Sequence, residues 1–333
     1  MSKGIGIIGA GVMGADHART LAVHVGGAEL VAVSDADDTR AAAAARANGA
    51  WRHYSDGFAL IEDPAVEAVL VASPDATHVG FVLACLKAGK PVLCEKPLAP
   101  TAGECLEVIE AERRLDRRMV QVGFMRRFDP AYGEMHDVVK QEALGRPLLL
   151  HCAHRNATAP GFFTPEMSIT NAAVHEFDIL RWLTGREIVA VTTLNCARKG
   201  AGPLRDPLML LVELDGGILA DVEVFMNAAY GYDVRTELVC ESGTVDLGRP
   251  LPNMRRFAGG QLQSFPGDWR GRFGEAYRLQ MQAWVAWLVG GEPRGADAWD
   301  GYAAMRVADA ALQSLESGAR IEVATAGPAV AAA

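Results

Sequence analysis

The 333-residue sequence lacks the features that mark several classes of protein. It has no run of about 18 apolar residues that could span a bilayer. Its N-terminal segment has too few apolar residues and too many glycines for a secretory signal. It has no dense run of lysine or arginine, and 41 acidic against 32 basic residues give a formal net charge of −9. We therefore expect no nucleic-acid partner and no membrane partner.

Cysteine is sparse and scattered. The six cysteines form no C-x-x-C pair and no cluster with metal-ligand spacing, which predicts reduced, mostly buried thiols and no metal site. The sequence also lacks a Ser-His-Asp elbow, a phosphate-binding lysine loop and an H-E-x-x-H helix. These absences are typical of a cytoplasmic protein without metal. At roughly 100–200 residues per domain, the length predicts two domains.

The first 122 residues alternate short apolar strands with helices. We expect strands at Gly4–Ile8, Glu29–Ser34, Ala65–Ala72, Pro91–Cys94 and Met119–Val122. We expect helices at Val12–His24, Thr39–Asn48, Thr77–Ala88 and Thr101–Leu115. Short, nearly all-apolar strands separated by helices are typical of a parallel sheet covered on both faces. Residues 1–122 are therefore predicted to form a doubly wound, dinucleotide-binding domain of the α/β class.

The second half has antiparallel character. Paired strands around turn residues predict hairpins at Pro207–Leu214 with Ile218–Phe225, and at Asp233–Cys240 with Thr244–Leu247. A helix from about Glu275 to Val289 follows and closes at a pair of glycines. We therefore expect residues 123–323 to form a separate α+β domain and residues 324–333 to be a flexible tail.

A glycine-rich turn joins the first strand to the first helix. Gly9-Ala10-Gly11-Val12-Met13-Gly14 matches G-x-G-x-x-G, in which Gly9 permits a tight turn, Gly11 lets the backbone approach a pyrophosphate, and Gly14 lets helix and strand pack. Asp35 ends the second strand, where a carboxylate accepts hydrogen bonds from the adenosine ribose and repels a 2′-phosphate. The alternative is a tight turn with an unrelated loop aspartate. Strand, helix and spacing together favour nucleotide binding, and Asp35 favours NAD, while Arg40 leaves NADP open.

Cys94-Glu95-Lys96-Pro97 stands where a predicted strand ends, at the edge of the sheet that faces the ligand crevice. A lysine there can hydrogen-bond a substrate oxygen and stabilise the alkoxide that develops as a hydride leaves the carbon. The alternative is a solvated ion pair followed by a turn proline. Position alone does not decide between the two.

His175 lies in a segment that reads as the start of a helix, from Asn171 to Asp178. At helical spacing Asn171 and Asp178 share a face with His175. A histidine can take a hydroxyl proton while a hydride moves to nicotinamide. The alternative is a core or capping histidine.

Other polar residues near strand ends could contact a substrate. Arg126 follows a strand, and Tyr232 precedes one beside Asp233. Ordinary surface hydrogen bonding is the alternative for each. Such side chains suit a neutral polyhydroxylated ring, and no basic cluster suits a phosphorylated one.

Four motifs occur in order along the first half: Gly9-x-Gly11-x-x-Gly14, Ser73-Pro74-Asp75-Ala76-Thr77-His78, Ala88-Gly89-Lys90-Pro91 and Glu95-Lys96-Pro97. Three segments of the second half extend the match: GFMRRFDP from Gly123, HEFDILRW from His175 and YGYDVR from Tyr230. Together they resemble the glucose–fructose oxidoreductase / inositol dehydrogenase / rhizopine catabolism (Gfo/Idh/MocA) family, and its inositol 2-dehydrogenase-like branch in particular. The resemblance extends to about residue 323.

The resemblance implies an N-terminal Rossmann domain and a C-terminal α+β domain with a large, open, mostly antiparallel sheet that commonly mediates homodimers or homotetramers. It implies that Lys96 and His175 are catalytic. Cofactor contacts are implied for Gly9, Gly11, Val12, Met13, Gly14, Asp35, Ser73, Pro74, His78, Glu95 and Lys96. Substrate contacts are implied for Lys96, Met125, Arg126, Asn156, Asn171, His175, Asp178 and Tyr232.

The sequence departs from the family at one catalytic position. The family has an aspartate four residues before the histidine, and here that residue is Asn171. An amide oxygen can still fix the tautomer of His175, but it cannot offset the charge of an imidazolium. The departure allows three outcomes: a slower enzyme, a charge arrangement that uses Asp178, or lost redox activity.

The sequence therefore predicts an NAD-dependent oxidoreductase that oxidises a secondary hydroxyl of a cyclitol or sugar. Two alternatives stay open. One is a glycoside hydrolase or eliminase that uses bound NAD transiently, without net redox change. The other is a non-catalytic sensor that binds a dinucleotide and a partner protein, an interpretation that Asn171 allows.

Overall fold

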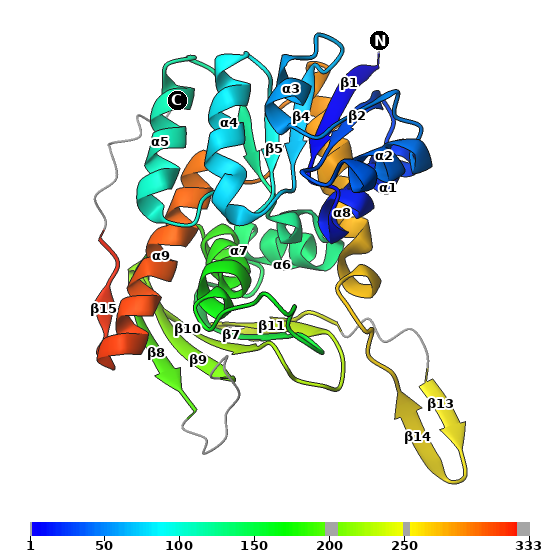
Figure 1. Ribbon diagram of the computed structural model, residues 1–333. Coiled ribbons are helices and arrows are strands. Elements are labelled where there is room, and N and C mark those ends of the chain that lie inside the picture. Colours follow the sequence, from blue (N-terminus) through cyan, green and yellow to red (C-terminus); the bar gives the residue numbers. More distant parts are fainter. Residues whose placement is uncertain (1, 197–205, 249–253, 325–333) are drawn as a thin grey trace. The chain divides into compact units, whose positions relative to one another are not determined.

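The computed structural model of the protein describes residues 2–196, 206–248 and 254–324. The chain forms two compact units, residues 1–130 with 273–305 and residues 131–272 with 306–333 (Figure 1). The sequence predicts a single boundary between residues 122 and 123, whereas the chain returns to the first unit after residue 272. Residues 325–333 of the predicted tail lie outside the described residues.

The first unit contains a parallel six-stranded sheet, as predicted. Its strands are β1 (Lys3–Ile8), β2 (Ala28–Ser34), β3 (Arg52–Tyr54), β4 (Ala68–Val71), β5 (Val92–Cys94) and β6 (Val120–Val122). Their order is β3-β2-β1-β4-β5-β6. This order reverses direction between β1 and β4, and in open α/β sheets the ligand crevice lies at such a point.

Helices cover both faces of this sheet. They are α1 (Val12–His24), α2 (Asp38–Ala47), α3 (Gly57–Glu62), α4 (His78–Lys87) and α5 (Ala102–Arg113). Figure 1 shows α4 and α5 side by side on one face and α1 and α2 on the other. The doubly wound arrangement predicted for this half is therefore confirmed. The sequence did not predict β3 and α3, which are too short to show a periodic pattern.

The returning segment supplies part of the core of the first unit. Within α8 (Arg270–Leu288), Met281 and Trp284 are fully buried and pack in one cluster with Ile7, Leu70 and Leu93 of the sheet. The backbone N–H of Val122 also donates to the carbonyl oxygen of Ala296. These contacts explain why residues 273–305 fold with the first unit.

The second unit is built on a seven-stranded sheet of order β12-β11-β7-β10-β9-β8-β15. Its strands are β7 (Pro147–Arg155), β8 (Ile188–Asn195), β9 (Leu208–Leu214), β10 (Ile218–Phe225), β11 (Asp233–Cys240), β12 (Gly243–Asp246) and β15 (Ile321–Glu322). Only β7 and β10 run parallel among its neighbouring pairs in the described residues. Both predicted hairpins and the mostly antiparallel sheet are confirmed.

Helices and a small hairpin complete the chain. They are α6 (Pro130–Lys140), α7 (Val174–Thr184), α9 (Ala298–Ser317), which runs from the first unit into the second, and the two-stranded sheet of β13 (Met254–Phe257) and β14 (Gly260–Gln263). In the part of the chain that the structure describes, no helix has the length and apolarity that crossing a bilayer requires.

The cysteines are free thiols, as predicted. Five of them are buried and Cys196 is exposed. Burial raises the pKa of the Cys85 thiol to about 12, so that thiol stays protonated and unreactive at neutral pH.

Gly14 and Gly11 provide a matched test of packing in the glycine-rich turn. A Cβ at Gly14 would lie 1.7 Å from the carbonyl oxygen of Gly9, whereas a Cβ at Gly11 would meet nothing within 4 Å. We expect Gly14→Ala to lower the free energy of unfolding by about 1–3 kcal/mol or more, because backbone must move. Gly11→Ala should change it by less than about 1 kcal/mol. Urea unfolding of the cofactor-free protein measures both, and equal losses would contradict this packing.

Candidate active site

The glycine-rich turn lies at the carboxyl edge of β1. Gly9 has a φ of +95°, and a Cβ there would lie 2.5 Å from the carbonyl oxygen of Ala72, just beyond β4. Gly11 is the N-cap of α1 and supplies no side-chain cap. The next side chain, Val12, is 65% exposed although it is apolar. The first amides of α1 are thus available to an anion, with room above Gly11 and an apolar side chain that a ligand could cover.

Asp35 follows β2 at the same edge of the sheet and is almost buried. Its carboxylate accepts hydrogen bonds from the backbone N–H of Ala10 (2.8 Å) and of Asp37 (2.9 Å), and from Nη2 of Arg40 (2.6 Å). Burial by itself would raise the pKa of Asp35, but the hydrogen bonds from Arg40, Asp37 and Ala10 outweigh it and hold the pKa below its ordinary value. The group is therefore a fixed negative charge beside the glycine-rich turn.

Ser73 to His78 follow β4 and lead into α4. The hydroxyls of Ser73 and Thr77 are 2.6 Å apart. The ring of His78 is 1% exposed. Its Nδ1 lies 2.7 Å from the carbonyl oxygen of Pro97, and its Nε2 lies 2.9 Å from that of Ser73. The His78 side chain therefore connects the end of β4 to the end of β5, a contact that the motif alone did not indicate.

Glu95 and Lys96 follow β5, and the Lys96–Pro97 peptide bond is cis. The carboxylate of Glu95 is 6% exposed and lies 2.7 Å from Nε2 of His17 on α1. Its second oxygen accepts the backbone N–H of Lys96 at 3.3 Å. The solvated ion pair considered as an alternative for this motif is therefore wrong for Glu95, since its partner is a buried histidine.

Met125 and Arg126 lie in a short 3₁₀ turn, Met125–Phe128, after β6. Both are buried, and Cζ of Arg126 lies 5.6 Å from the ring centroid of Phe273. The neighbouring Arg127 pairs with Asp300 at 3.0 Å. The turn thus holds one buried and one partly buried arginine within the first unit.

His175 lies in the first turn of α7 in the second unit and is 7% exposed. The prediction of an α-helix that begins at Asn171 is wrong. Residues Ser168–Ala173 form a π-helical turn, and α7 begins at Val174. The four-residue spacing between Asn171 and His175 is therefore not the spacing of one α-helical face. Asp178 lies three residues beyond His175 within α7, so these two share a face as predicted. π-Turns occur frequently at functional sites.

A buried polar group that the sequence did not predict lies beside His175. Nδ1 of His154, on β7, is 3.1 Å from Oε2 of Glu176 on α7, and both side chains are nearly inaccessible. The ring of His154 is 6.1 Å from that of His175 and 6.3 Å from that of Tyr232, between ring centroids. The alternating pattern of β7, which buries Leu150, Cys152 and His154, was the available signal for His154.

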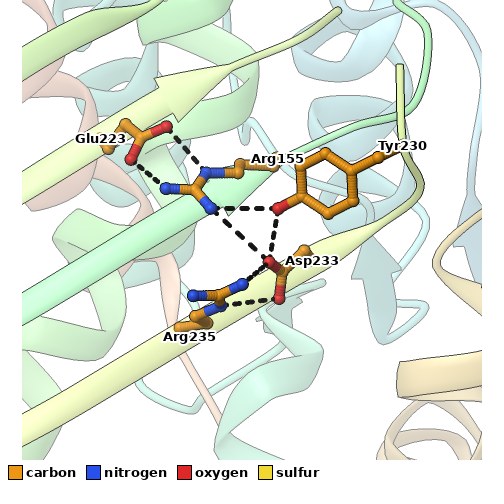
Figure 2. Close-up of polar contacts among 5 residues, drawn as sticks. All are labelled: Arg155, Glu223, Tyr230, Asp233 and Arg235. Atoms are coloured by element: carbon orange, nitrogen blue, oxygen red, sulfur yellow. Dashed lines mark hydrogen bonds and ion pairs between the residues drawn. The ribbon is translucent and has the colours of Figure 1, made fainter. Parts of the chain in front are cut away.

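Figure 2 shows a polar network in the second unit that joins Arg155, Glu223, Tyr230, Asp233 and Arg235. Arg155 forms a two-pronged pair with Glu223 and also donates to the hydroxyl of Tyr230 (3.0 Å). That hydroxyl donates to Asp233 at 2.5 Å, and Arg235 binds the same carboxylate.

Hydrogen bonds within this network keep the carboxyl group of Asp233 ionised. Burial would raise the pKa of Asp233, but hydrogen bonds from Arg235 and Tyr230 lower it overall.

Two predicted substrate residues are sequence neighbours of this network. Asn156 follows Arg155 directly, and Tyr232 lies between Tyr230 and Asp233 in the sequence. Oδ1 of Asn156 is buried without a hydrogen-bond partner among the described residues, so it has an acceptor to spare.

The predicted site residues fall into two groups. The first unit carries Gly9, Gly11, Val12, Met13, Gly14, Asp35, Ser73, Pro74, His78, Glu95, Lys96, Met125 and Arg126. The second unit carries Asn156, Asn171, His175, Asp178 and Tyr232.

Comparison with known proteins identifies the family to which both halves of the chain belong. Residues 3–124 match an oxidoreductase family with an NAD-binding Rossmann fold, and residues 132–246 match the GFO/IDH/MocA C-terminal domain. The chain is 52% identical over 326 residues to inositol 2-dehydrogenase 1 of Saccharopolyspora erythraea, covering 97% of both chains. It is 46% identical to an inositol 2-dehydrogenase of Acidothermus cellulolyticus, covering 94% of this chain and 92% of the other.

A solved structure has the same fold. The myo-inositol dehydrogenase from Lactobacillus casei, in complex with NAD(H) and myo-inositol, superposes with a TM-score of 0.94. It is 31% identical in sequence, and the match covers 99% of each chain.

Asp35 and Asp37 allow a matched test of cofactor choice. Asp35→Ser removes the buried carboxylate and releases Arg40, so we expect the ratio of NADH to NADPH affinity to fall by about tenfold or more. Asp37→Ser keeps a hydroxyl that can cap α2, where the Asp37 side chain accepts the N–H of Arg40, and it should leave the ratio unchanged. Fluorescence titration with the two reduced cofactors measures this ratio. An equal change in both variants would contradict the role of Asp35.

Proposed function

The chain belongs to the Gfo/Idh/MocA oxidoreductase family, and from that premise we propose that it is an NAD-dependent dehydrogenase that oxidises a secondary hydroxyl of a cyclitol, as an inositol 2-dehydrogenase does. The observation that carries the proposal is the 52% identity, over nearly the full length, to a protein of that name. Asp35 favours NAD, because the approach of a 2′-phosphate would meet its charge.

The residues of the first unit suit the cofactor. The open N-terminus of α1 binds the pyrophosphate through its amides, and the cofactor covers the exposed side chain of Val12. Asp35 accepts hydrogen bonds from the ribose hydroxyls. Ser73, Pro74 and the segment Glu95-Lys96 follow the neighbouring strand ends and lie along the nicotinamide side. The bound nicotinamide supplies the hydride acceptor.

The proton and the developing charge are handled by side chains. Lys96 donates a hydrogen bond to the substrate oxygen and stabilises the negative charge that grows on it. His175 accepts the hydroxyl proton. Asn171 orients the imidazole, and Asp178, on the same face of α7, supplies the negative charge that an asparagine lacks.

The remaining polar side chains select a neutral ring. Asn156 offers its buried amide oxygen to a hydroxyl donor, and Tyr232 lies beside His154. Arg126 donates to ring oxygens, with Met125 beside it. These groups suit hydroxyls, which donate and accept, better than they suit a phosphate.

One face of the seven-stranded sheet is suited to bind a second copy of the chain. Leu194, Leu211 and Leu219, here termed the leucine face, share one side of the sheet and are 46%, 46% and 51% exposed. Cross-strand pairs lie on the same side, among them His151 with Asp221. We propose a homodimer or homotetramer in which this face is covered.

The free thiols suit a reducing, cytoplasmic setting for this enzyme.

Turnover tests the proposed function directly. The protein mixed with NAD and a panel of inositol stereoisomers and sugars should produce NADH with at least one cyclitol, followed by absorbance. Lys96→Met and His175→Leu should lower kcat by about 10²–10⁴-fold, because each removes a group that acts on the reacting oxygen or its proton. Both variants should still bind NADH.

Asn171→Asp separates the alternatives. It adds a second negative charge to that of Asp178 and so stabilises an imidazolium further, and we therefore expect kcat to rise. A product formed without NADH would identify a hydrolase or eliminase, and a chain that is inactive both before and after this substitution would identify a sensor. Either result would contradict the dehydrogenase.

The leucine face gives a separate prediction about assembly. Leu211→Glu with Leu219→Glu should lower the molar mass measured by light scattering from that of a dimer or tetramer, because burying two carboxylates at an interface is costly. Val23→Glu, at a 67% exposed position on α1 of the first unit, should leave the mass unchanged. A monomeric parent protein, or an unchanged mass in the double variant, would contradict this interface.

A further inference from the structure

Two buried histidines hold the segment Glu95-Lys96-Pro97 from two different helices of the first unit. His17 of α1 lies 2.7 Å from the carboxylate of Glu95. His78 of α4 lies 2.7 Å from the carbonyl oxygen of Pro97. Lys96 is the residue between these two attachment points. Neither histidine is more than 2% exposed.

Burying the carboxylate of Glu95 costs free energy, and neighbouring groups pack closely around it. A carboxylate removed from water requires a partner for its charge and hydrogen bonds for its lone pairs. One oxygen of Glu95 contacts His17, and the other accepts the backbone N–H of Lys96. Gly123, after β6, packs against this second oxygen. A Cβ at position 123 would lie 2.8 Å from it, so a larger residue there would displace the carboxylate of Glu95.

The ring of His17 is itself oriented. It makes an edge-on contact with the ring of Tyr277 on α8, with 5.6 Å between centroids. His17 lies three residues after Gly14, so the helix that begins at the glycine-rich turn also carries this ring. The ring of His17 therefore has two partners, Glu95 and Tyr277, both in the first unit. Glu95 is the one that precedes Lys96 directly, so an effect of His17 on Lys96 passes through Glu95.

We propose that His17 is a positioning residue for Lys96. Through the buried carboxylate of Glu95 and its hydrogen bond to the Lys96 amide, it sets the direction in which Lys96 leaves β5. The ammonium group is thereby held where it can stabilise charge on a substrate oxygen. The kinetic part of this inference rests on the proposed function, in which Lys96 acts on that oxygen.

The kinetic test compares His17→Gln with His24→Gln, which makes the same change at an exposed position of the same helix. We expect His17→Gln to lower kcat by about tenfold to a hundredfold, because small displacements of a reacting group cost that much. The dissociation constant of NADH should change by less than about twofold. His24→Gln should leave both quantities unchanged. An unchanged kcat in folded His17→Gln would overturn the proposal.

A double-substitution cycle separates positioning from a general structural effect. In a Lys96→Met background, His17→Gln should alter the residual kcat by less than about twofold, because the group that it positions is gone. The same fractional loss in both backgrounds would overturn the proposal. Glu95→Gln keeps the shape of the side chain and serves where His17→Gln does not fold. It should reproduce the loss of kcat, and a fully active Glu95→Gln would also overturn the proposal.

Lysine reactivity provides a readout that needs no turnover. The rate at which an N-hydroxysuccinimide ester acylates Lys96 is measured by peptide mass spectrometry. It should rise by about threefold or more in His17→Gln, since a lysine no longer held is more accessible, and stay constant in His24→Gln. An unchanged or lower rate would overturn the positioning role. If the parent protein oxidises no cyclitol, the proposed function fails, while this rate still decides the role of His17.

Discussion

The strands of the first unit all run in one direction, and their carboxyl ends therefore meet at one edge of the sheet. Gly9 follows β1, Asp35 follows β2, Ser73 follows β4 and Glu95 follows β5. Gly9 and Ser73, which are 64 positions apart in the sequence, thus become neighbours along this edge. Polar contacts hold this edge together: Asp35 with Arg40, Glu95 with His17, and His78 with two carbonyl oxygens. In the proposed function, cofactor binding and the orientation of Lys96 both depend on this arrangement.

In the second unit the two-residue period of the strands gives the two faces of the sheet different side chains. Along β7 the inward residues include His154, which lies beside His175 and Tyr232. The outward residues of β7 and β10 include His151 and Asp221, on the side of the leucine face. The sheet therefore presents His154 on one face, and the exposed leucines beside charged pairs such as His151 with Asp221 on the other. The proposed function assigns the first face to the substrate and the second to assembly. A one-residue shift in register would exchange the two.

Local signals in the sequence were sufficient for much of the fold. The glycine-rich turn, the hairpin around Asp215-Gly216-Gly217 and the apolar strands were all predicted, because their patterns lie within a few consecutive residues. The pairing of His17 with Glu95 could not be predicted, since it joins residues 78 positions apart. The π-turn before His175 was missed because the spacing of Asn171 also fits an α-helix. The return of residues 273–305 was missed because the apolar face of a helix does not indicate which core it enters.

In the proposed reaction a hydride moves from a cyclitol carbon to the nicotinamide of NAD, and a protein side chain accepts the hydroxyl proton. Mass spectrometry of the reduced cofactor, formed with inositol deuterated at every ring carbon, follows this transfer. Each molecule of NADH formed should carry one deuterium, and turnover should be slower than with ordinary inositol where hydrogen transfer limits the rate. NADH without deuterium, or product without NADH, would contradict this reaction.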